Sequence, residues 1–337
     1  MKTMKDIAVL LGISVNAVSL ALNDRKGVSE KTRIKVLETA KTLGYLDKKT
    51  RYAHTFGNHH LGVLLQDIYR SDLGFYGEVL YSLEKEAKNH YYDILLHHFN
   101  DANMTVPDFI VKRRAAGVIV LGKISDKNIS ALLPFPMIVI DHAPRMLNIN
   151  CIRTDNISGG FIAADYLISR GFHTVGFFGD PSYSISVRER YYGFLEALYR
   201  NGIVDFNKTD AYVKKYSLLE KVEPFIMNMD AGSIRKKLQK KILPSAFFCS
   251  NDQAAVTMIH ALELMNITVP KDISIIGFDN GMLVEKINPK LTSINVNREL
   301  MGRKAVQRLI RLIEEDDTEA EHTILQVELV ERDSVKI

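Results

Sequence analysis

Four polar residues stand just past short apolar stretches, where their side chains could recognise a small molecule. They are Asp67, Asp141, Asn251 and Asp279, which follow the apolar segments 61–65, 137–140, 246–249 and 273–277. Ligands of an open α/β sheet bind at the carboxyl ends of its strands, so these side chains would meet in one cleft. Their oxygens accept hydrogen bonds, which suits a small ligand that carries donor groups. A turn or capping role is the alternative for Asp141 and Asp279, because the string 279–281 (DNG) is typical of a turn.

The first 23 residues carry a second set of polar side chains, and their spacing suits DNA. Apolar residues at helical spacing predict one helix at 6–11 and another at 15–22, separated by Gly12 and capped by Ser14. Two short helices joined by such a turn are typical of a helix-turn-helix, whose second helix enters the major groove.

The residues expected to face the groove are Val15, Asn16 and Leu20, with Ser14 and Ser19 nearer the phosphates. Asparagine can pair with adenine through two hydrogen bonds, whereas valine and leucine contact only methyl groups. Burial in the core is the alternative for Val15 and Leu20. We reject it because Val18 and Leu22 already occupy the inner face of the helix.

A third helix is predicted at 30–43, after a turn at 23–27 and a cap at Ser29. Its expected apolar face consists of Ile34, Leu37, Ala40 and Leu43. This face would close a small three-helix bundle with the helix-turn-helix.

The positive charge of the chain is concentrated at its start. Residues 1–60 contain 11 Lys and Arg against 5 Asp and Glu, whereas the rest of the chain contains 33 against 35. A basic head on a near-neutral body indicates contact between the head and phosphates. A merely solvated charged face is the alternative, and the helix-turn-helix pattern decides against it.

The remaining sequence alternates short apolar strands with helices. Strands are expected at 61–65, 93–96, 117–121, 137–140, 174–178, 246–249, 273–277 and 324–329, and helices at 75–90, 109–114, 157–169, 187–200, 253–265 and 301–314. This alternation predicts parallel sheets that are covered on both faces, arranged as two doubly wound lobes.

Several classes of protein are disfavoured by what the sequence lacks. No run approaches the roughly 20 apolar residues of a membrane span, and charged residues interrupt any signal peptide. Two cysteines, Cys151 and Cys249, are too few for a disulfide framework, which suits the cytoplasm. The expected location is therefore cytoplasmic, without a membrane partner.

The sequence also lacks the signatures of an enzyme. There is no P-loop, Gly-x-Ser-x-Gly or His-Glu-x-x-His motif. The adjacent histidine pairs at 59–60 and 97–98 lack cysteine partners at metal-ligand spacing. Paired carboxylates in the cleft could hydrolyse glycosides, but this would leave the helix-turn-helix unexplained. We therefore expect no catalytic site, no metal and no cofactor.

These motifs together resemble the lactose-repressor/galactose-repressor (LacI/GalR) family of bacterial transcription regulators. The head carries that family's pattern at 6–8 (DIA), 12–14 (GIS), 17–19 (AVS), 22–23 (LN), 28–29 (VS) and 32–33 (TR). The body carries it at 155–156 (DN), 190 (R), 193–194 (GF), 197–198 (AL), 251–252 (ND), 254 (A), 269–270 (VP), 277–279 (GFD), 289 (P) and 291–292 (LT).

The resemblance implies an all-α helix-turn-helix head and an α/β body of periplasmic-binding-protein type, with two lobes joined by three crossovers. The domains expected are the head at 1–46, a hinge at 47–60, and an effector-binding and dimerisation domain at 61–337. Lobe 1 is expected at 61–152 and 284–318, and lobe 2 at 154–282 and 322–332. The crossovers would lie near 152–155, 280–284 and 317–323, and the helix at 301–313 would return to lobe 1.

The resemblance also implies further DNA contacts. Thr3, Asn23, Ser29 and Thr32 would contact the DNA backbone, and Ala17 would belong to the recognition helix. The linker keeps the family's Tyr45, but Asp47 replaces the usual proline and no Ala-Arg-x-Leu hinge helix follows. Phosphate contacts of Lys48 and Arg51 are the expected substitute.

On the effector side, the resemblance adds Phe75, Ser186 and Arg190 to the four residues that follow strands. An arginine fork and an aromatic plane suit the hydroxyl groups and the C–H face of a sugar. Ordinary core packing is the alternative for Phe75.

The sequence thus predicts a homodimeric repressor of carbohydrate-utilisation genes. It would read a near-palindromic operator in double-stranded DNA, with its affinity controlled by a small effector, expected to be a sugar. One alternative is a regulator whose co-effector is a protein. Another is a stand-alone sugar-binding protein, against which the basic head and the absent export signal argue.

Overall fold

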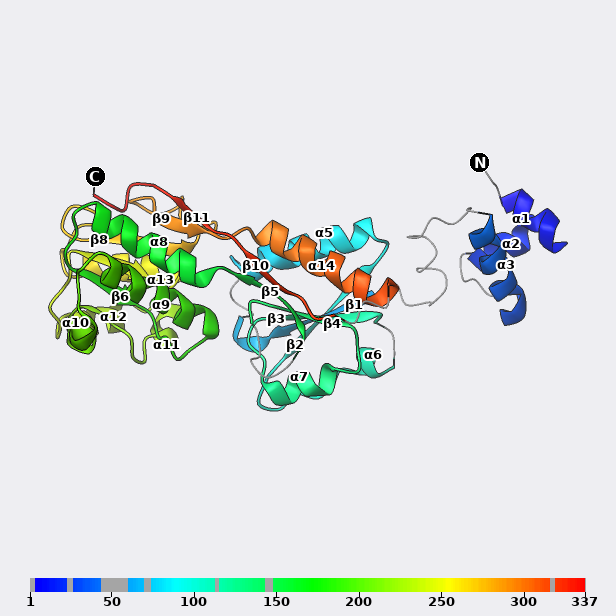
Figure 1. The fold of residues 1–337 in the computed structure, drawn as a ribbon, viewed down its shortest axis with the longest axis horizontal. Coiled ribbons are helices and arrows are strands. Elements are labelled where there is room, and N and C mark those ends of the chain that lie inside the picture. Colours follow the sequence, from blue (N-terminus) through cyan, green and yellow to red (C-terminus); the bar gives the residue numbers. More distant parts are fainter. Residues whose placement is uncertain are drawn as a thin grey trace.

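The computed structural model describes residues 4–22, 27–43, 60–69, 74–112, 115–142, 148–315 and 319–336. It contains a helical head and two α/β lobes (Figure 1). The predicted DNA contacts outside the described residues are Thr3, Asn23, Tyr45, Lys48 and Arg51, and nearly all of the predicted hinge also falls there. No single described helix is long and apolar enough to cross a membrane, although the first two helices pass that test as a pair bent by 110°.

Three helices form the head: α1 (Met4–Leu11), α2 (Val15–Leu22) and α3 (Glu30–Thr42). Gly12 joins the first two with a φ of 63°, a left-handed conformation that favours glycine. The hydroxyl of Ser14 accepts a hydrogen bond from the Ala17 amide at 3.0 Å and so caps α2. Ser29 caps α3 in the same way, through the Thr32 amide at 3.1 Å. The predicted helix-turn-helix is confirmed.

The core of the head differs from the prediction in one helix. Ile7, Val18 and Val36 are fully buried, whereas Ile34, which was expected on the apolar face of α3, is 49% exposed. Residues two apart point to opposite sides of a helix, so Ile34 and Val36 cannot both face α1 and α2. The prediction for Ile34 was therefore wrong. The neighbouring Arg33 donates from Nη1 to the Ala21 carbonyl at 3.2 Å and satisfies the end of α2.

The first lobe is a parallel sheet with the strand order β10-β5-β4-β3-β1-β2. Its strands are β1 (His60–Gln66), β2 (Asp93–Phe99), β3 (Gly117–Leu121), β4 (Met137–Ile140), β5 (Asn150–Thr154) and β10 (His322–Leu325). Helices α5 (Tyr76–Asn89) and α14 (Arg298–Glu314) cover one face, and α6 (Asp108–Val111) and α7 (Asp126–Leu132) lie toward the other (Figure 1). Ile119 packs on the first face and Val118 and Val120 on the second, so both faces of the sheet are buried.

The second lobe has the strand order β11-β9-β8-β7-β6, in which only the pair β11–β9 is antiparallel. Its strands are β6 (Val175–Phe178), β7 (Ala246–Cys249), β8 (Ser274–Asp279), β9 (Thr292–Asn295) and β11 (Glu328–Val330). Its helices are α8 (Asn156–Ser169), α9 (Ile185–Arg200), α10 (Thr209–Tyr216), α11 (Glu223–Met227), α12 (Ala231–Leu238) and α13 (Asp252–Glu263). Phe177 and Phe248 pack in one apolar cluster, whereas Phe178 and Phe247 pack in another on the opposite face.

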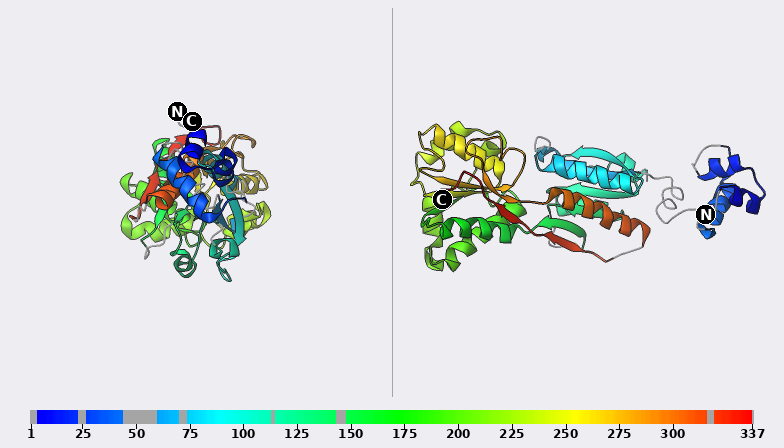
Figure 2. Two further views of the ribbon diagram at one scale, coloured as in Figure 1. Left: turned by 90° about the vertical axis from the view of Figure 1, so that its right-hand side faces the viewer. Right: turned by 90° about the horizontal axis from the view of Figure 1, so that it is seen from above.

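Three segments connect the lobes (Figures 1 and 2), and two of them differ from the prediction. The first lies between β5 and α8, close to the expected 152–155. The second was expected at 280–284, but β9 pairs with β8 in the second sheet, so the chain crosses between Asn295 and Arg298. The third was expected at 317–323, but β10 pairs with β5 in the first sheet, so the chain crosses between Leu325 and Glu328. The strand predicted at 324–329 is therefore two strands in two sheets. As expected, α14 returns to the first lobe, where it packs on α5.

The pair of helices α8 and α9 is packed backbone to backbone. A Cβ atom added to Gly160 would lie 2.1 Å from the carbonyl oxygen of Arg190, and one added to Gly193 would lie 2.0 Å from that of Ile157. Only glycine allows this approach. The contact holds Arg190 of α9 next to the beginning of α8, where Asn156 stands.

Candidate functional site

The polar residues that were expected at the carboxyl ends of strands lie there in the structure. Asp141 directly follows β4, Asn251 follows β7 after one residue, and Asp279 ends β8. Ser186 and Arg190 lie one turn apart on α9 of the second lobe. Hydrogen bonds connect several of these residues, both within and between the lobes.

The guanidinium of Arg190 is the most heavily bonded group of the cluster. Its Nε donates to Asn156 Oδ1 at 3.0 Å, its Nη1 to the carbonyl of Ser250 at 2.6 Å, and its Nη2 to Asp279 Oδ1 at 3.1 Å. The ring of Phe278 lies 3.7 Å below the guanidinium carbon. Because Arg190 is only 5% exposed, its charge is stable only with such partners. Arg190 thus joins α8, β7 and β8 at one point.

Asp141 makes one of the direct contacts between the two lobes. Its Oδ1 accepts a hydrogen bond from the Ser186 hydroxyl at 2.9 Å, and its Oδ2 accepts one from the Tyr76 hydroxyl at 3.0 Å. Ser186 belongs to the second lobe and Tyr76 to the first. The backbone of Asp141 is left-handed, with a φ of 58°, a conformation that aspartate adopts more readily than most residues. Burial raises the pKa of the Asp141 carboxyl, although Arg190 and the two hydroxyl donors act in the opposite direction.

The aromatic part of the cluster differs from the prediction. Phe75 is 7% exposed and packs in the core of the first lobe, so the alternative of core packing describes its position. Its neighbour Tyr76 supplies the polar contact to Asp141 and lies 4.6 Å from Tyr69, between ring centroids. The sequence analysis missed both Tyr69 and Tyr76. The signal that could have indicated them was the pair of aromatic residues that follows the predicted strand at 61–65.

Two other predicted residues make fewer contacts in the cluster. Asn251 caps α13, because its Oδ1 accepts a hydrogen bond from the Ala254 amide at 2.7 Å. Asp67 begins the short 3-10 helix η1 (Asp67–Tyr69), and its side chain is exposed. Among the described residues it has no hydrogen bond or ion pair. Among the described residues, therefore, no hydrogen bond joins Asp67 to the other candidates.

Two buried carboxyl groups beside the cleft were missed by sequence reasoning. Asp252 accepts from the Ser293 hydroxyl at 2.5 Å and from the Gly281 amide at 2.8 Å, which fixes the turn after β8. Glu223 accepts from the Asp180 amide at 3.0 Å at the end of β6. Burial raises the pKa of Asp252, and burial raises that of Glu223 from 4.5 to about 7. Neither position could be recognised from sequence, because burial of an acid leaves no local pattern.

Four buried polar atoms at or just past the carboxyl ends of strands have no hydrogen-bond partner among the described residues. They are Gln66 Oε1 at the end of β1, Thr154 Oγ1 at the end of β5, Ser250 Oγ after β7 and Asn280 Oδ1 after β8. Most buried polar atoms in folded proteins are hydrogen-bonded, so each of these atoms calls for an explanation. Their position at the carboxyl edges of both sheets is where a bound ligand would supply the missing partners.

The head presents a separate candidate surface on α2. Ser14, Val15 and Asn16 are exposed, while Ala17, Ser19 and Leu20 are partly exposed. The hydroxyls of Ser14 and Ser29 accept hydrogen bonds in the two helix caps. Thr32 lies within 2.8 Å of Ser29, oxygen to oxygen. Asn16 thus presents an exposed side-chain amide on this surface.

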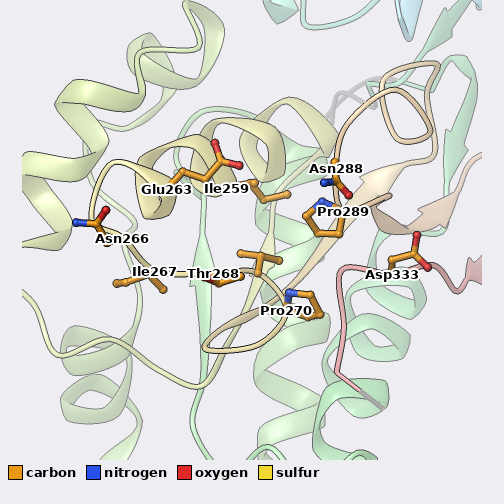
Figure 3. Close-up of a pocket in the computed structure, with 10 residues that line it drawn as sticks. Ile259, Glu263, Asn266, Ile267, Thr268, Pro270, Asn288, Pro289 and Asp333 are labelled. Carbon is orange, nitrogen blue, oxygen red and sulfur yellow. The ribbon is translucent and has the colours of Figure 1, made fainter.

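A cavity of about 560 Å³ lies elsewhere in the second lobe (Figure 3). Its walls come from the end of α13, at Ile259 and Glu263, and from the loops that lead into β8 and β9, at Pro270 and Pro289. It therefore opens at the amino ends of these strands, opposite the cluster around Arg190. Within the described part of the chain, no group of three His, Cys, Asp or Glu side chains is placed to hold a metal ion.

The raised pKa of Glu223 predicts how stability depends on pH. Between pH 4.5 and about 7 the unfolded carboxyl is ionised while the folded one holds its proton. The unfolded state then binds fewer protons, so this group lowers the free energy of unfolding as pH rises through that window. Glu223→Gln removes the cost of ionisation. Urea unfolding should show the variant gaining about 3 kcal/mol over wild type between pH 4.5 and pH 8.

Glu220→Gln provides the control for this prediction, because Glu220 is an exposed carboxylate three residues away. It should leave the pH dependence of unfolding as in wild type. If the free energy of unfolding changes with pH in the same way for wild type and Glu223→Gln, the pKa of Glu223 is not raised and the prediction is wrong.

Comparison with known proteins agrees with this architecture. Residues 3–47 match the family model "Bacterial regulatory proteins, lacI family", and residues 164–335 match "Periplasmic binding protein-like domain". The chain is 28% identical to the HTH-type transcriptional repressor PurR of Photobacterium profundum, over all of this chain and 99% of that protein. It is also 28% identical to the repressor CytR of Escherichia coli, over 99% of this chain and 96% of that one.

Solved structures share the fold. The lac repressor dimer bound to operator and an anti-inducer has a TM-score of 0.70 at 22% identity, over 99% of this chain and 98% of that one. A LacI family regulator from Enterococcus faecium with bound ribose has a TM-score of 0.70 at 24% identity, over 82% and 98%. The lacI model covers the head, and the periplasmic binding protein-like model covers about half of the whole chain. The protein therefore belongs to the LacI family of bacterial regulatory proteins.

Proposed function

We propose that the protein is a cytoplasmic, homodimeric transcriptional repressor whose operator affinity is set by a neutral, hydroxylated ligand, a sugar, bound between its two lobes. It is a regulator and not an enzyme, in keeping with its family and with relatives that are named repressors. Genes of carbohydrate use are the proposed targets.

The observation that carries the ligand proposal is the set of acceptor atoms between the lobes. The Asp141 carboxylate is shared by hydroxyls from both lobes, and the acceptors Gln66 Oε1 and Asn280 Oδ1 lack partners among the described residues. A ligand rich in hydroxyl donors satisfies such a site, because each unpaired buried acceptor is costly. Two structural relatives are described with ribose and with cellobiose.

The proposed DNA contact is made by α2 of each head. Asn16 is exposed near the start of this helix, where it can pair with an adenine edge in the major groove. The basic charge of residues 1–60 adds phosphate attraction that does not depend on sequence. Thr3, Asn23, Ser29, Thr32, Tyr45, Lys48 and Arg51 remain proposed backbone contacts.

The dimer is supported by apolar side chains exposed on the first lobe. Tyr81 on α5 is 69% exposed, Leu96 on the edge strand β2 is 47% exposed, and Ile324 on the opposite edge strand β10 is 55% exposed. An unpaired strand edge with an exposed apolar side chain is a place where another chain can pair. Two heads in one dimer would read two half-sites, which is why the operator should be near-palindromic.

The recognition role of Asn16 can be tested with double-stranded DNA that the wild-type protein selects from a random pool. Asn16→Ala should weaken binding to the selected sequence by about 1–3 kcal/mol, because the paired hydrogen bonds to adenine are lost. Binding to random DNA should stay unchanged, since phosphate contacts dominate it. Gel shift at a fixed salt concentration measures binding to the selected and to the random DNA. Glu38→Gln, at an exposed position of α3, is the control. Equal loss on both DNAs, or no loss, would contradict the assignment of the recognition helix.

The ligand role of Asp141 can be tested by thermal shift of the whole protein against neutral mono- and disaccharides, including ribose and cellobiose. A sugar present at 100 times its Kd should stabilise wild type by about 2.7 kcal/mol. Asp141→Asn keeps a residue that tolerates positive φ but removes one acceptor, so it should abolish the shift. Asp126→Asn, at the exposed start of α7, should retain it. An unchanged shift in Asp141→Asn would refute this assignment of the cleft.

A further inference from the structure

Arg298 opens α14 immediately after the second crossover, and its contacts reach both lobes. Its Nε donates to Glu78 Oε2 on α5 of the first lobe at 2.7 Å. Its Nη1 donates to the carbonyl of Asp279, and its Nη2 to the carbonyl of Asn280 at 3.0 Å, both at the end of β8 in the second lobe. The side chain is 8% exposed, so these partners have replaced water around the charge.

The two carbonyl groups belong to an unusual turn. Asp279 and Asn280 have φ angles of 104° and 52°, both positive and both outside glycine. Residues with a side chain rarely adopt positive φ angles, so contacts with neighbouring residues must stabilise this backbone conformation. Arg190 binds the carboxylate of Asp279, and Arg298 binds the backbone carbonyl of the same residue. The turn is therefore fixed between two arginines.

On the side of the first lobe, Arg298 is held by two helices that are bonded to each other, α5 and α14. The Ser82 hydroxyl of α5 donates to the Glu299 carbonyl of α14 at 2.6 Å, and Lys85 pairs with the Glu299 carboxylate at 3.1 Å. Further along, Gln307 of α14 donates to Glu86 of α5 at 2.8 Å. Arg298 is thus part of a helix that packs firmly on the first lobe.

We propose that Arg298 is a positioning residue that holds the Asp279–Asn280 turn of the second lobe against α5 of the first lobe, and so fixes the angle between the lobes. The chain of contacts runs from Arg190 through Asp279 and Arg298 to Glu78. A lysine cannot replace this arginine, because one ammonium cannot reach a carboxylate and two carbonyls with the planar fork of a guanidinium. If a ligand bound in the cleft shifts Asp279, the shift reaches α5 by this route; that consequence alone rests on the proposed function.

The experiment measures the distance between the lobes in the full chain without any ligand. Spin labels are placed by Lys127→Cys on α7 of the first lobe and Lys240→Cys after α12 of the second, both at exposed positions. The native cysteines Cys151 and Cys249 are buried. Labelled protein is diluted with unlabelled protein so that each dimer carries one labelled copy. Double electron–electron resonance then gives the distribution of distances between the lobes.

Arg298→Gln should broaden this distribution and shift its centre relative to wild type. Glu78→Ala, which removes the acceptor at a partly exposed position and leaves the folded core intact, should produce the same kind of change. A variant with both changes should broaden the distribution no further than Arg298→Gln alone, because both changes remove the same contact between Arg298 and Glu78. Arg298→Lys should not restore the wild-type distribution.

Arg308→Gln is the matched control. Arg308 lies on the same helix and is 4% exposed, but its partners Asn150 and Glu321 belong to the first lobe. It should lower thermal stability and leave the distance between the lobes as in wild type. The proposal is overturned if Arg298→Gln or Glu78→Ala leaves the distribution unchanged, or if Arg308→Gln broadens it equally. Because no ligand or DNA is involved, these outcomes do not depend on whether the protein is a sugar-responsive repressor.

Discussion

The buried charge of Arg190 is the constraint on which the second lobe and its cleft depend. A guanidinium that is 5% exposed must be bonded on its edges, and here it takes Asn156, the Ser250 carbonyl and Asp279. These partners come from the start of α8, the end of β7 and the end of β8. The glycines at 160 and 193 let α9 approach α8 closely enough for this arrangement. Packing of small residues in the helices thus determines where the polar end of the sheet is placed.

The contacts between the lobes follow from that placement. Ser186 lies one turn before Arg190 on α9, and its hydroxyl reaches Asp141 of the first lobe. Asp279, which Arg190 orients, also offers its carbonyl to Arg298, whose helix is packed on α5. One contact closes the cleft at Asp141, and the other spans the second crossover. A ligand that competes for the hydroxyls around Asp141 would act on the same arrangement that sets the angle between the lobes.

Much of the fold could be predicted from sequence where burial leaves a pattern. The strands at 117–121, 137–140 and 246–249 were predicted at their observed bounds, because a continuous apolar run marks a strand buried on both faces. The second and third crossovers could not be placed, because a crossing segment is as extended as a strand. Residues 324–329 were therefore predicted as one strand, although the pairing of β10 with β5 and of β11 with β9 puts them in different sheets.

The candidate site was predictable only in part for a similar reason. Residues that follow apolar strands, such as Asp141 and Asp279, could be expected at the cleft from their position alone. Asp252, Glu223 and Arg298 could not, because their roles arise from contacts between segments far apart in the chain. Ile34 shows the same limit in the head, since the phase of a short helix is fixed by its neighbours and not by its own composition.

Reciprocal binding tests the central claim most directly, namely that the cleft and the helix-turn-helix are coupled in one molecule. The selected operator DNA is titrated with and without a saturating sugar from the thermal-shift panel, and the same sugar is titrated with and without saturating operator. Coupling requires that the two affinities change by the same factor, typically about 5- to 150-fold. We expect equal factors in this range. A sugar that binds with the same affinity in the presence and absence of operator would contradict the account.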